Sequence, residues 1–500
     1  MATLRERLGQ PGSFLVAAEL VTGHGPLGAP SGAAVLELAR ALADDPRIDV
    51  LSITENPGGT AMLAPEALAL DARERGQETI VHVSCKDANR NALESRGWQL
   101  ASAGLENVLA VSGDYPAGGR DGLAAPVFDL DSVGLLHLYA GQEHSDFFLG
   151  CVVTNHKRHE REVVPQYLKL RKKTAAGARF TIKQIGWNVR KDHELLQFIR
   201  REQLPLRALA NVYLLSRRSA RTFHRGRIPG VVVTDELLEL AERHGGSPDR
   251  GRAFFLDLAA KHVAIARGLG YDGVYLGGHV PAETLGDVVE RAADYAGDWQ
   301  SLVPELTFES EGEFYLFARD ETGLSSDRLS DAFVASTERR RTDLRVPVKY
   351  RFSRRLHQGV FAPDAPLFGA GRAVYGAVDR GPRPIGKALH VLEQAAKVPL
   401  FHCRDCGDCS LPEIAYVCPE SQCAKNQRNG PCGGTRDGLC EVYDTECIWS
   451  QAYERLKAYG EAETLVDGPV VIKDNALRGT SAWANTFLHR DHTTRPDAPS

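Results

Sequence analysis

Eight short apolar runs in the first 300 residues constrain the fold of this chain more than any other feature. Most contain β-branched residues and are too short to be buried helices, so each is expected to form a strand. The runs occupy residues 14–20, 49–54, 79–84, 107–113, 147–154, 179–185, 209–215 and 271–277. Helical segments lie between several of them, and alternating strands and helices indicate a parallel sheet. The sequence therefore predicts an α/β fold whose eight units match a (β/α)8 TIM barrel.

A doubly wound open sheet is the competing interpretation. It would require a Gly-rich loop after the first strand, but the first run leads into Glu19 and then TGHGP. The Gly-rich stretch FGAGRAVYG (368–376) follows no clear strand and is weak support for nucleotide binding. In a TIM barrel, functional groups lie at the carboxyl ends of the strands, which is where polar residues such as Glu19, Thr54, Asp114 and Gln184 are expected.

Cysteines are concentrated near the C-terminus. Eight of the ten lie there: Cys403, Cys406, Cys409, Cys418, Cys423, Cys432, Cys440 and Cys447. The first four read C-x2-C-x2-C-x8-C-P, which resembles the iron–sulfur ligand pattern of bacterial ferredoxins apart from a longer last gap. This spacing favours a [4Fe-4S] cluster over zinc at the first four. The wider gaps of the second four fit zinc or another cluster, and mixed membership of the two quartets stays open.

Size and charge indicate an ordinary multidomain globular protein. The chain has 500 residues, 25% of them charged, and a net charge of -5, so neither nucleic acid nor a membrane is expected as a partner. The N-terminus lacks the apolar core of a signal peptide, and we expect a cytoplasmic protein. We divide the chain into a barrel (1–300), a connecting region that packs with the C-terminal module (301–400), a cysteine-rich metal-binding domain (401–470) and a tail (471–500).

With these strand ends in place, residues 10–300 resemble methylenetetrahydrofolate reductase. The resemblance rests on short motifs in the right order: AAEL (17–20), LSIT (51–54), IVHVSCKD (80–87), NVLAVSGDYP (107–116), QYLKLRKKTAAGARFTIKQ (166–184) and YDGVYLGGH (271–279). The family uses a (β/α)8 barrel with a non-covalent flavin at its C-terminal mouth. The region 300–470 resembles a cysteine-rich module that is fused to, or encoded beside, some of these reductases.

The resemblance implies roles for individual residues. Glu19 corresponds to the family's catalytic acid, and Asp114 to the acidic residue that lies near the flavin and contacts the pterin ring. Gln184 corresponds to a folate contact. The flavin contacts implied are Thr54, His82, Gly113, Asp114 and Lys173.

The implied activity is flavin-mediated hydride transfer that interconverts 5,10-methylenetetrahydrofolate and 5-methyltetrahydrofolate. FAD is favoured over FMN, although Ser112 stands where an Arg often precedes Gly-Asp. NAD(P)H or a protein such as ferredoxin could supply electrons, and a homo-oligomer is expected. The alternatives are an electron-transfer or non-catalytic flavin/metal protein serving a methyl-transfer pathway, and a flavin-free methyltransferase barrel.

Several residues carry a structural interpretation beside the functional one. Asp114 could cap a helix, and His82 could fill the barrel core. The basic run 169–173 could meet phosphate or the folate tail, or form a solvated helix face. His156 and His159 are better interpreted as solvated basic residues than as a zinc pair.

Overall fold

The N-terminal half of the chain is a closed parallel barrel. The computed structural model describes residues 2–119, 122–338 and 346–494. The strand order around the barrel is β1-β10-β9-β8-β7-β4-β3-β2. Its strands are β1 (Leu15–Leu20), β2 (Val50–Ile53), β3 (Glu78–Ser84), β4 (Asn107–Val111), β7 (Phe148–Val153), β8 (Phe180–Lys183), β9 (Arg207–Tyr213) and β10 (Gly273–Gly277). Each corresponds to one predicted run, so the (β/α)8 prediction is confirmed and an open sheet is excluded.

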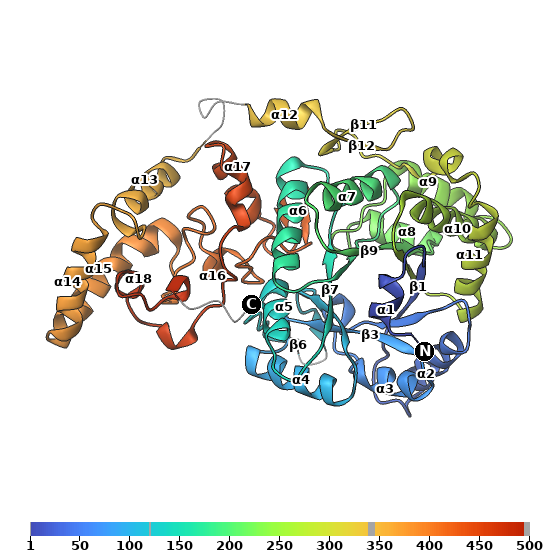
Figure 1. Cartoon of the computed structure of the whole chain (residues 1–500), viewed down its shortest axis with the longest axis horizontal. Coiled ribbons are helices and arrows are strands. Elements are labelled where there is room, and N and C mark those ends of the chain that lie inside the picture. Colours follow the sequence, from blue (N-terminus) through green and yellow to red (C-terminus); the bar gives the residue numbers. More distant parts are fainter. Residues whose placement is uncertain (1, 120–121, 339–345, 495–500) are drawn as a thin grey trace.

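Helices surround the barrel, as Figure 1 shows. They are α2 (Pro30–Ala43), α3 (Glu66–Glu74), α4 (Arg90–Ser102), α5 (Ser132–Ala140), α6 (Glu160–Ala175), α7 (Val189–Arg201), α8 (Arg217–His224), α9 (Asp235–His244), α10 (Arg252–Leu269) and α11 (Ala282–Asp294). Helix α1 (Leu4–Gly9) instead lies at the amino end of the strands, where Leu4 and Leu8 join the interior cluster. Short elements in this part are η1 (Pro57–Gly59), β5 (Gly118–Gly119), β6 (Gly122–Leu123) and η2 (Trp299–Leu306).

The strands are buried on both faces, which explains why they appear as continuous apolar runs. Alternate residues point into the barrel, where Ala17, Val50, Ile80, Ile182 and Tyr275 belong to one interior cluster. The intervening residues pack outward against the helices. Continuing the same alternation toward the carboxyl ends places the next inward positions at the barrel mouth.

After the barrel, β11 (Phe317–Arg319) and β12 (Ser325–Leu329) pack against α7, and α12 (Asp331–Thr337) follows them (Figure 1). The remaining part of the chain forms a second lobe beside the barrel (Figure 1). Its larger elements are α13 (Val348–Leu356), α14 (Phe368–Arg380), α15 (Arg383–Phe401), α16 (Pro419–Gln422), β13 (Thr435–Arg436), β14 (Leu439–Cys440), α17 (Ile448–Lys457) and α18 (Ala482–Phe487). Shorter turns are η4 (His357–Phe361), η5 (Ala462–Val466), η6 (Asn475–Leu477) and η7 (His492–Thr494). The predicted tail thus contains η6, α18 and η7, and its last residues, 495–500, lie outside the described part. Among the described residues, no helix is both long and apolar enough to cross a membrane.

Candidate active site at the barrel mouth

Glu19 lies on the interior face of the barrel near the end of β1. Tyr275 of β10 donates a hydrogen bond from its hydroxyl to Glu19 Oε1 at 3.0 Å. Burial raises the pKa of Glu19, and the hydrogen bond from Tyr275 only partly opposes this shift. The neighbouring Tyr213 of β9 has its pKa raised to about 12 by burial and by the charge of Glu19. The mouth therefore holds a carboxyl group that keeps its proton to a higher pH than a free glutamate does.

His82 and Thr54 share this interior layer. His82 Nε2 lies 2.9 Å from Ser52 Oγ, and burial lowers the pKa of His82 to about 3, so the ring is neutral at physiological pH. Thr54 is buried and its hydroxyl donates to the carbonyl oxygen of Leu20 at 3.4 Å. His82 is therefore buried in the barrel interior, as its interpretation as a core residue predicts, and its role as a flavin contact stays a prediction.

Asp114 lies just beyond β4. Its Oδ2 accepts a hydrogen bond from the backbone N–H of Gly58 at 2.7 Å. The next helix, α5, is capped by Asp131, so helix capping is not the role of Asp114. Gly113 beside it has φ +84°, and a Cβ there would lie 2.1 Å from Ser84 Oγ, so this turn requires glycine.

The C-terminal lobe reaches the same mouth. Gly433 of the GPCGG run lies against Thr154, directly after β7, where a Cβ on Gly433 would be 2.4 Å from Thr154 Oγ1. Gly230 packs against both Gly433 and Gln184. A Cβ on Gly230 would lie 3.0 Å from the carbonyl oxygen of Gly433 and 3.3 Å from Gln184 Nε2. On the other side, Lys425 Nζ donates to the carbonyl oxygen of Gly113 at 2.8 Å. The cysteine-rich lobe thus borders the candidate site.

Lys173 is not brought into this interior layer. It lies on α6, where its ammonium donates to the backbone carbonyl of Val152 in β7. Burial lowers the pKa of Lys173 to about 8. Its contact in this structure is with the barrel wall, whereas Glu19, Thr54, His82 and Gln184 face inward.

Lys169 fastens the second lobe to the barrel. Its ammonium donates to Gln427 Oε1 at 3.1 Å and to the carbonyl oxygens of Gly430 at 3.1 Å and Pro431 at 3.0 Å. The side chain is 1% exposed, and Lys172 and Lys173 are also buried. The interpretation of residues 169–173 as a solvated helix face is therefore wrong for the three lysines, which are buried, and holds only for Arg171, whose side chain is 33% exposed.

Replacing Lys169 by Met is expected to destabilise the docked lobe by about 2–4 kcal/mol, because three buried acceptors lose their donor. Limited proteolysis of the segment between the lobes, carried out along a urea titration, measures this loss of stability. Arg171→Met is the matched control on the same helix, since Arg171 makes surface ion pairs with Glu463 and Glu202 worth about 0–1 kcal/mol. Equal stability of the two variants would contradict the role given to Lys169.

His156 is also buried, which corrects its interpretation as a solvated basic residue. Its Nε2 lies 2.9 Å from Asp192 Oδ1, and the same carboxylate is bonded by Lys183 and His262, each at 2.9 Å. Burial lowers the pKa of His156 to about 4. This network ties the loop after β7 to α7 and α10. Sequence spacing could not reveal it, because its members are distant in the chain.

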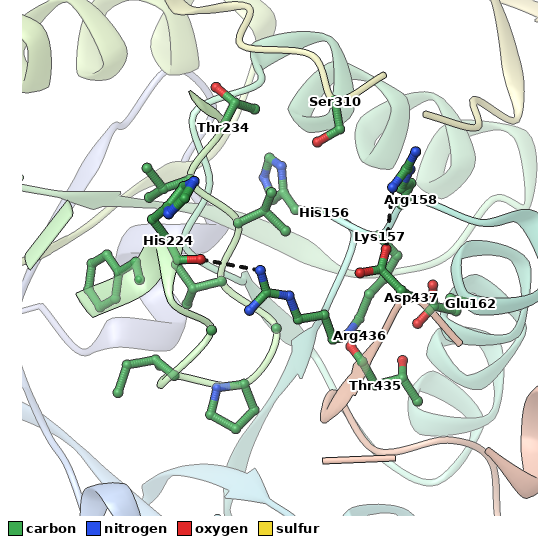
Figure 2. A pocket seen from close by; sticks show the side chains of 18 of the residues that line it. His156, Lys157, Arg158, Glu162, His224, Thr234, Ser310, Thr435, Arg436 and Asp437 are labelled. Carbon is green, nitrogen blue, oxygen red and sulfur yellow. Dashed lines mark hydrogen bonds and ion pairs between the residues drawn. The ribbon is translucent and has the colours of Figure 1, made fainter. Parts of the chain in front are cut away.

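A cavity of about 800 Å³ lies at the seam between the lobes. It is bordered by the end of α8 and the following loop, the start of α6, residues 309–313 and the β13–β14 hairpin (Figure 2). Arg436 crosses it to donate to the carbonyl oxygen of His224 at 3.2 Å. Glu162 lines it, and both of its carboxylate oxygens are buried without a hydrogen-bond partner. Gly230 also lines the cavity, so it adjoins the Gln184 side of the mouth.

The first four cysteines gather around one small space. Cys403, Cys406, Cys409 and Cys418 line it together with Lys397 and Arg428. Lys397 Nζ lies 3.6 Å from Cys409 Sγ. The space is only about 10 Å³, and among the described residues no three metal-binding side chains are positioned to hold a single ion. The donor set is therefore assembled in one place, with two cations beside it, although the thiols do not form a closed tetrahedral site.

The second four cysteines form a separate group nearer the barrel. Burial and the neighbouring Cys432 raise the pKa of Cys423 to about 12, and burial with Cys432 and Cys440 does the same for Cys447. The carbonyl oxygen of Cys432 accepts a hydrogen bond from Gln166 of α6 at 2.7 Å. This group thus lies at the seam, next to the barrel mouth.

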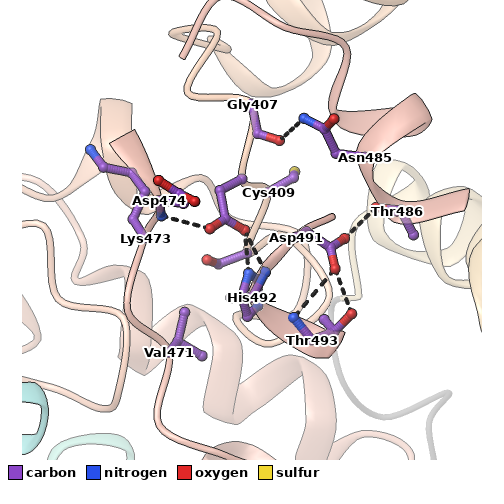
Figure 3. A network of polar contacts seen from close by, with 12 residues as sticks. Gly407, Cys409, Val471, Lys473, Asp474, Asn485, Thr486, Asp491, His492 and Thr493 are labelled. Carbon is purple, nitrogen blue, oxygen red and sulfur yellow. Dashed lines mark hydrogen bonds and ion pairs between the residues drawn. The ribbon is translucent and has the colours of Figure 1, made fainter. Parts of the chain in front are cut away.

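The end of the chain closes over the first cysteine loop (Figure 3). His492 Nδ1 lies 2.5 Å from Asp408 Oδ1, and its Nε2 lies 3.2 Å from Glu413 Oε1. Asn485 of α18 donates to the carbonyl oxygen of Gly407 at 2.9 Å. Residues 482–494 therefore brace the loop that carries Cys406 and Cys409.

Barrel, mouth and cysteine groups together define a TIM-barrel protein with a fused cysteine-rich domain. Residues 35–233 match the family model described as methylenetetrahydrofolate reductase, and residues 385–475 match the model described as methylene-tetrahydrofolate reductase C terminal. The two matches together cover more than half of the chain. The chain belongs to the methylenetetrahydrofolate reductase family and carries its C-terminal domain in the same polypeptide.

Comparisons with solved structures add little. An uncharacterized protein from Clostridium thermocellum that binds two copies of 5-methyl-5,6,7,8-tetrahydrofolic acid is 12% identical, with 59% of this chain and 99% of that chain covered and a TM-score of 0.41. A 2,3-dimethylmalate lyase is 15% identical (62% and 90% covered, TM-score 0.33), and a putative deoxyribose-phosphate aldolase from Toxoplasma gondii ME49 is 11% identical (56% and 92% covered, TM-score 0.30). No curated protein matches the chain.

Proposed function

We propose that this protein is a flavin-dependent methylenetetrahydrofolate reductase that interconverts 5,10-methylenetetrahydrofolate and 5-methyltetrahydrofolate. The observation that carries the proposal is Glu19, a half-buried glutamate with a raised pKa at the mouth of a barrel of this family. Opening the five-membered ring of methylenetetrahydrofolate requires an acid that protonates the leaving nitrogen. A glutamate whose pKa is raised by burial is suited to that step.

Other groups at the mouth suit the pterin ring. The carboxylate of Asp114 can accept hydrogen bonds from the amino and ring N–H groups of the pterin and can stabilise the cationic iminium. Gln184 offers both a donor and an acceptor, and its Oε1 already accepts from the N–H of Ile185 at 2.9 Å. The seam cavity beside it has a volume within the range of about 300–1,000 Å³ typical of small-molecule sites. We place the folate between Asp114 and this cavity.

We assign the flavin to the same mouth, in contact with Thr54, His82 and Gly113. Flavin, when bound, supplies the hydride. Ser112 stands where an Arg often precedes Gly-Asp in the family. Its Oγ donates to Gln427 of the second lobe at 3.2 Å, so this side chain is bonded to the protein itself. Other groups must therefore bind the phosphates, and FAD stays the favoured form.

We propose a [4Fe-4S] cluster at Cys403, Cys406, Cys409 and Cys418. The ferredoxin-like spacing supports it, and Lys397 and Arg428 would offset the charge of four thiolates. The thiols would have to open outward around it, since the enclosed space is small. The second group, Cys423 to Cys447, would hold another cluster or zinc.

Anaerobic purification followed by a visible spectrum and analysis of iron, sulfide and zinc tests these cofactors together. We expect about one flavin per chain and iron with an equal amount of sulfide. Titration with NADH, NADPH and reduced ferredoxin then identifies the electron donor, which is the reagent that reduces the flavin and bleaches its absorbance. Colourless, flavin-free protein would contradict the proposal and favour a methyltransferase barrel.

A further inference from the structure

Helix α15 exposes an apolar face to solvent. Most of its exposed positions from Ile385 onward are apolar, and the large apolar side chains among them are 40–68% exposed. The apolar positions are Ile385, Ala388, Val391, Leu392, Ala395, Val398 and Leu400, and Lys387 is an exposed charged residue beside them. All of these apolar positions except Leu400 follow the i, i+3, i+4 spacing of a single helix face. Normally such a face is turned toward a protein core.

The polar face of α15 is the buried one. Glu393 is fully buried, pairs with Lys397 at 3.0 Å and accepts a hydrogen bond from Ser481 at 2.6 Å. Lys397 also approaches Cys409 at 3.6 Å. Because this face is committed to the cysteine loop, α15 cannot rotate to bury its apolar residues within the chain. The outward face is a fixed surface of the folded protein.

Helix α13 adds to this surface at the C-terminal end of α15. Lys349 of α13 donates to the carbonyl oxygen of Leu400, and Val348, Phe352 and Leu356 are 39–70% exposed. At about 200 Å² for a fully exposed large side chain, these three and the five large residues of α15 expose on the order of 800 Å². That is larger than the largest apolar patch of a typical monomer, about 300–600 Å², and similar to the roughly 800 Å² that each partner contributes to a standard interface.

We propose that this face, α15 with α13, is the contact through which two copies of this chain form a dimer. The pattern of α15 is self-complementary in an antiparallel pair centred on Leu392, because the small residues Ala388 and Ala395 flank Leu392 on both sides and let the helices approach closely. In that arrangement Arg383 and Lys387, near the N-terminal end of one α15, lie toward the carbonyl end of the other, which favours positive charge. The inference is independent of the function proposed above.

Sedimentation velocity of the full chain over a range of concentrations tests this proposal. We expect wild-type protein to be a dimer, and Leu392→Lys to weaken dimerisation by roughly 100-fold or more, since two copies of the charge would be buried together. Leu70→Lys is the matched control, because Leu70 is an exposed leucine (43%) on α3 of the barrel. It should remain dimeric.

A second measurement keeps the proposal testable if Leu392→Lys folds poorly. Backbone amide exchange of residues 385–400 in wild-type protein should slow as the protein concentration rises through the dimerisation constant. A wild-type protein that is monomeric at all concentrations overturns the proposal, as does a dimer that survives in Leu392→Lys. Monomers that bind anionic lipid vesicles through α15 would also overturn it.

Discussion

Replacing Glu19 by Gln is expected to lower the rate of the folate half-reaction by about 10²–10⁴-fold, while leaving flavin reduction by the electron donor largely intact. The amide preserves the shape of the side chain but cannot donate the proton that ring opening requires. Stopped-flow absorbance of the flavin separates the two half-reactions, since each changes the flavin redox state in one direction.

The pH dependence gives a second readout of the same residue. Burial raises the pKa of Glu19, so the carboxyl group is protonated below that raised value and ionised above it. The folate half-reaction in the direction of reduction should therefore slow as the pH rises through this pKa. In Glu19→Gln that limb of the profile should disappear.

Glu242→Gln is the control for this prediction. Glu242 lies on α9, where it forms surface ion pairs with Arg217 at 2.6 Å and with Arg221. The substitution Glu242→Gln makes the same change of carboxylate to amide at the surface of the protein. Normal folate turnover in Glu19→Gln, or an equal loss in both variants, would remove Glu19 from the mechanism.

Replacing Cys406 by Ser is expected to empty the first cysteine site and leave the second occupied. Metal held by a structural site of this kind stabilises its fold by as much as about 10–16 kcal/mol, so the loop around Cys406 should lose protease resistance as well. Iron, sulfide and zinc per chain, measured in the same preparations, show which element is lost. Loss of iron and sulfide together supports a cluster, and loss of zinc alone identifies a zinc site.

Cys85→Ser is the matched control for this substitution. Cys85 is buried in the barrel part of the chain, directly after β3, so this variant removes one thiol without touching either cysteine group. We expect its metal content to equal that of the wild type. Retention of full metal in Cys406→Ser would contradict the assignment of Cys406 as a ligand.

Local pattern was sufficient to predict the barrel and part of its mouth. Strands buried on both faces appear as continuous apolar runs, and the period of two places Glu19, Thr54, His82 and Gln184 on the inward side. Every barrel strand overlaps a predicted run, although β3 begins one residue and β9 two residues before the run. The residue roles at the mouth, however, rest on the family resemblance and stay predictions.

The sequence alone could not predict the contacts between segments that lie far apart in the chain. The run that contains Lys169 was interpreted as a solvated helix face or as a contact for phosphate or the folate tail, because its actual partners, residues 427–431, lie some 260 positions away. His156 was interpreted as solvated because its partner Asp192 lies on a different helix. The docking of the cysteine-rich lobe against the mouth follows from such pairs, and helix periodicity gives no sign of them.

Anaerobic mixing of photoreduced protein with 5,10-methylenetetrahydrofolate tests the central claim most directly. The account predicts that the absorbance of oxidised flavin returns in one turnover, with one 5-methyltetrahydrofolate formed per flavin. A flavin that stays reduced in the presence of saturating folate, in protein of full flavin content, would contradict it.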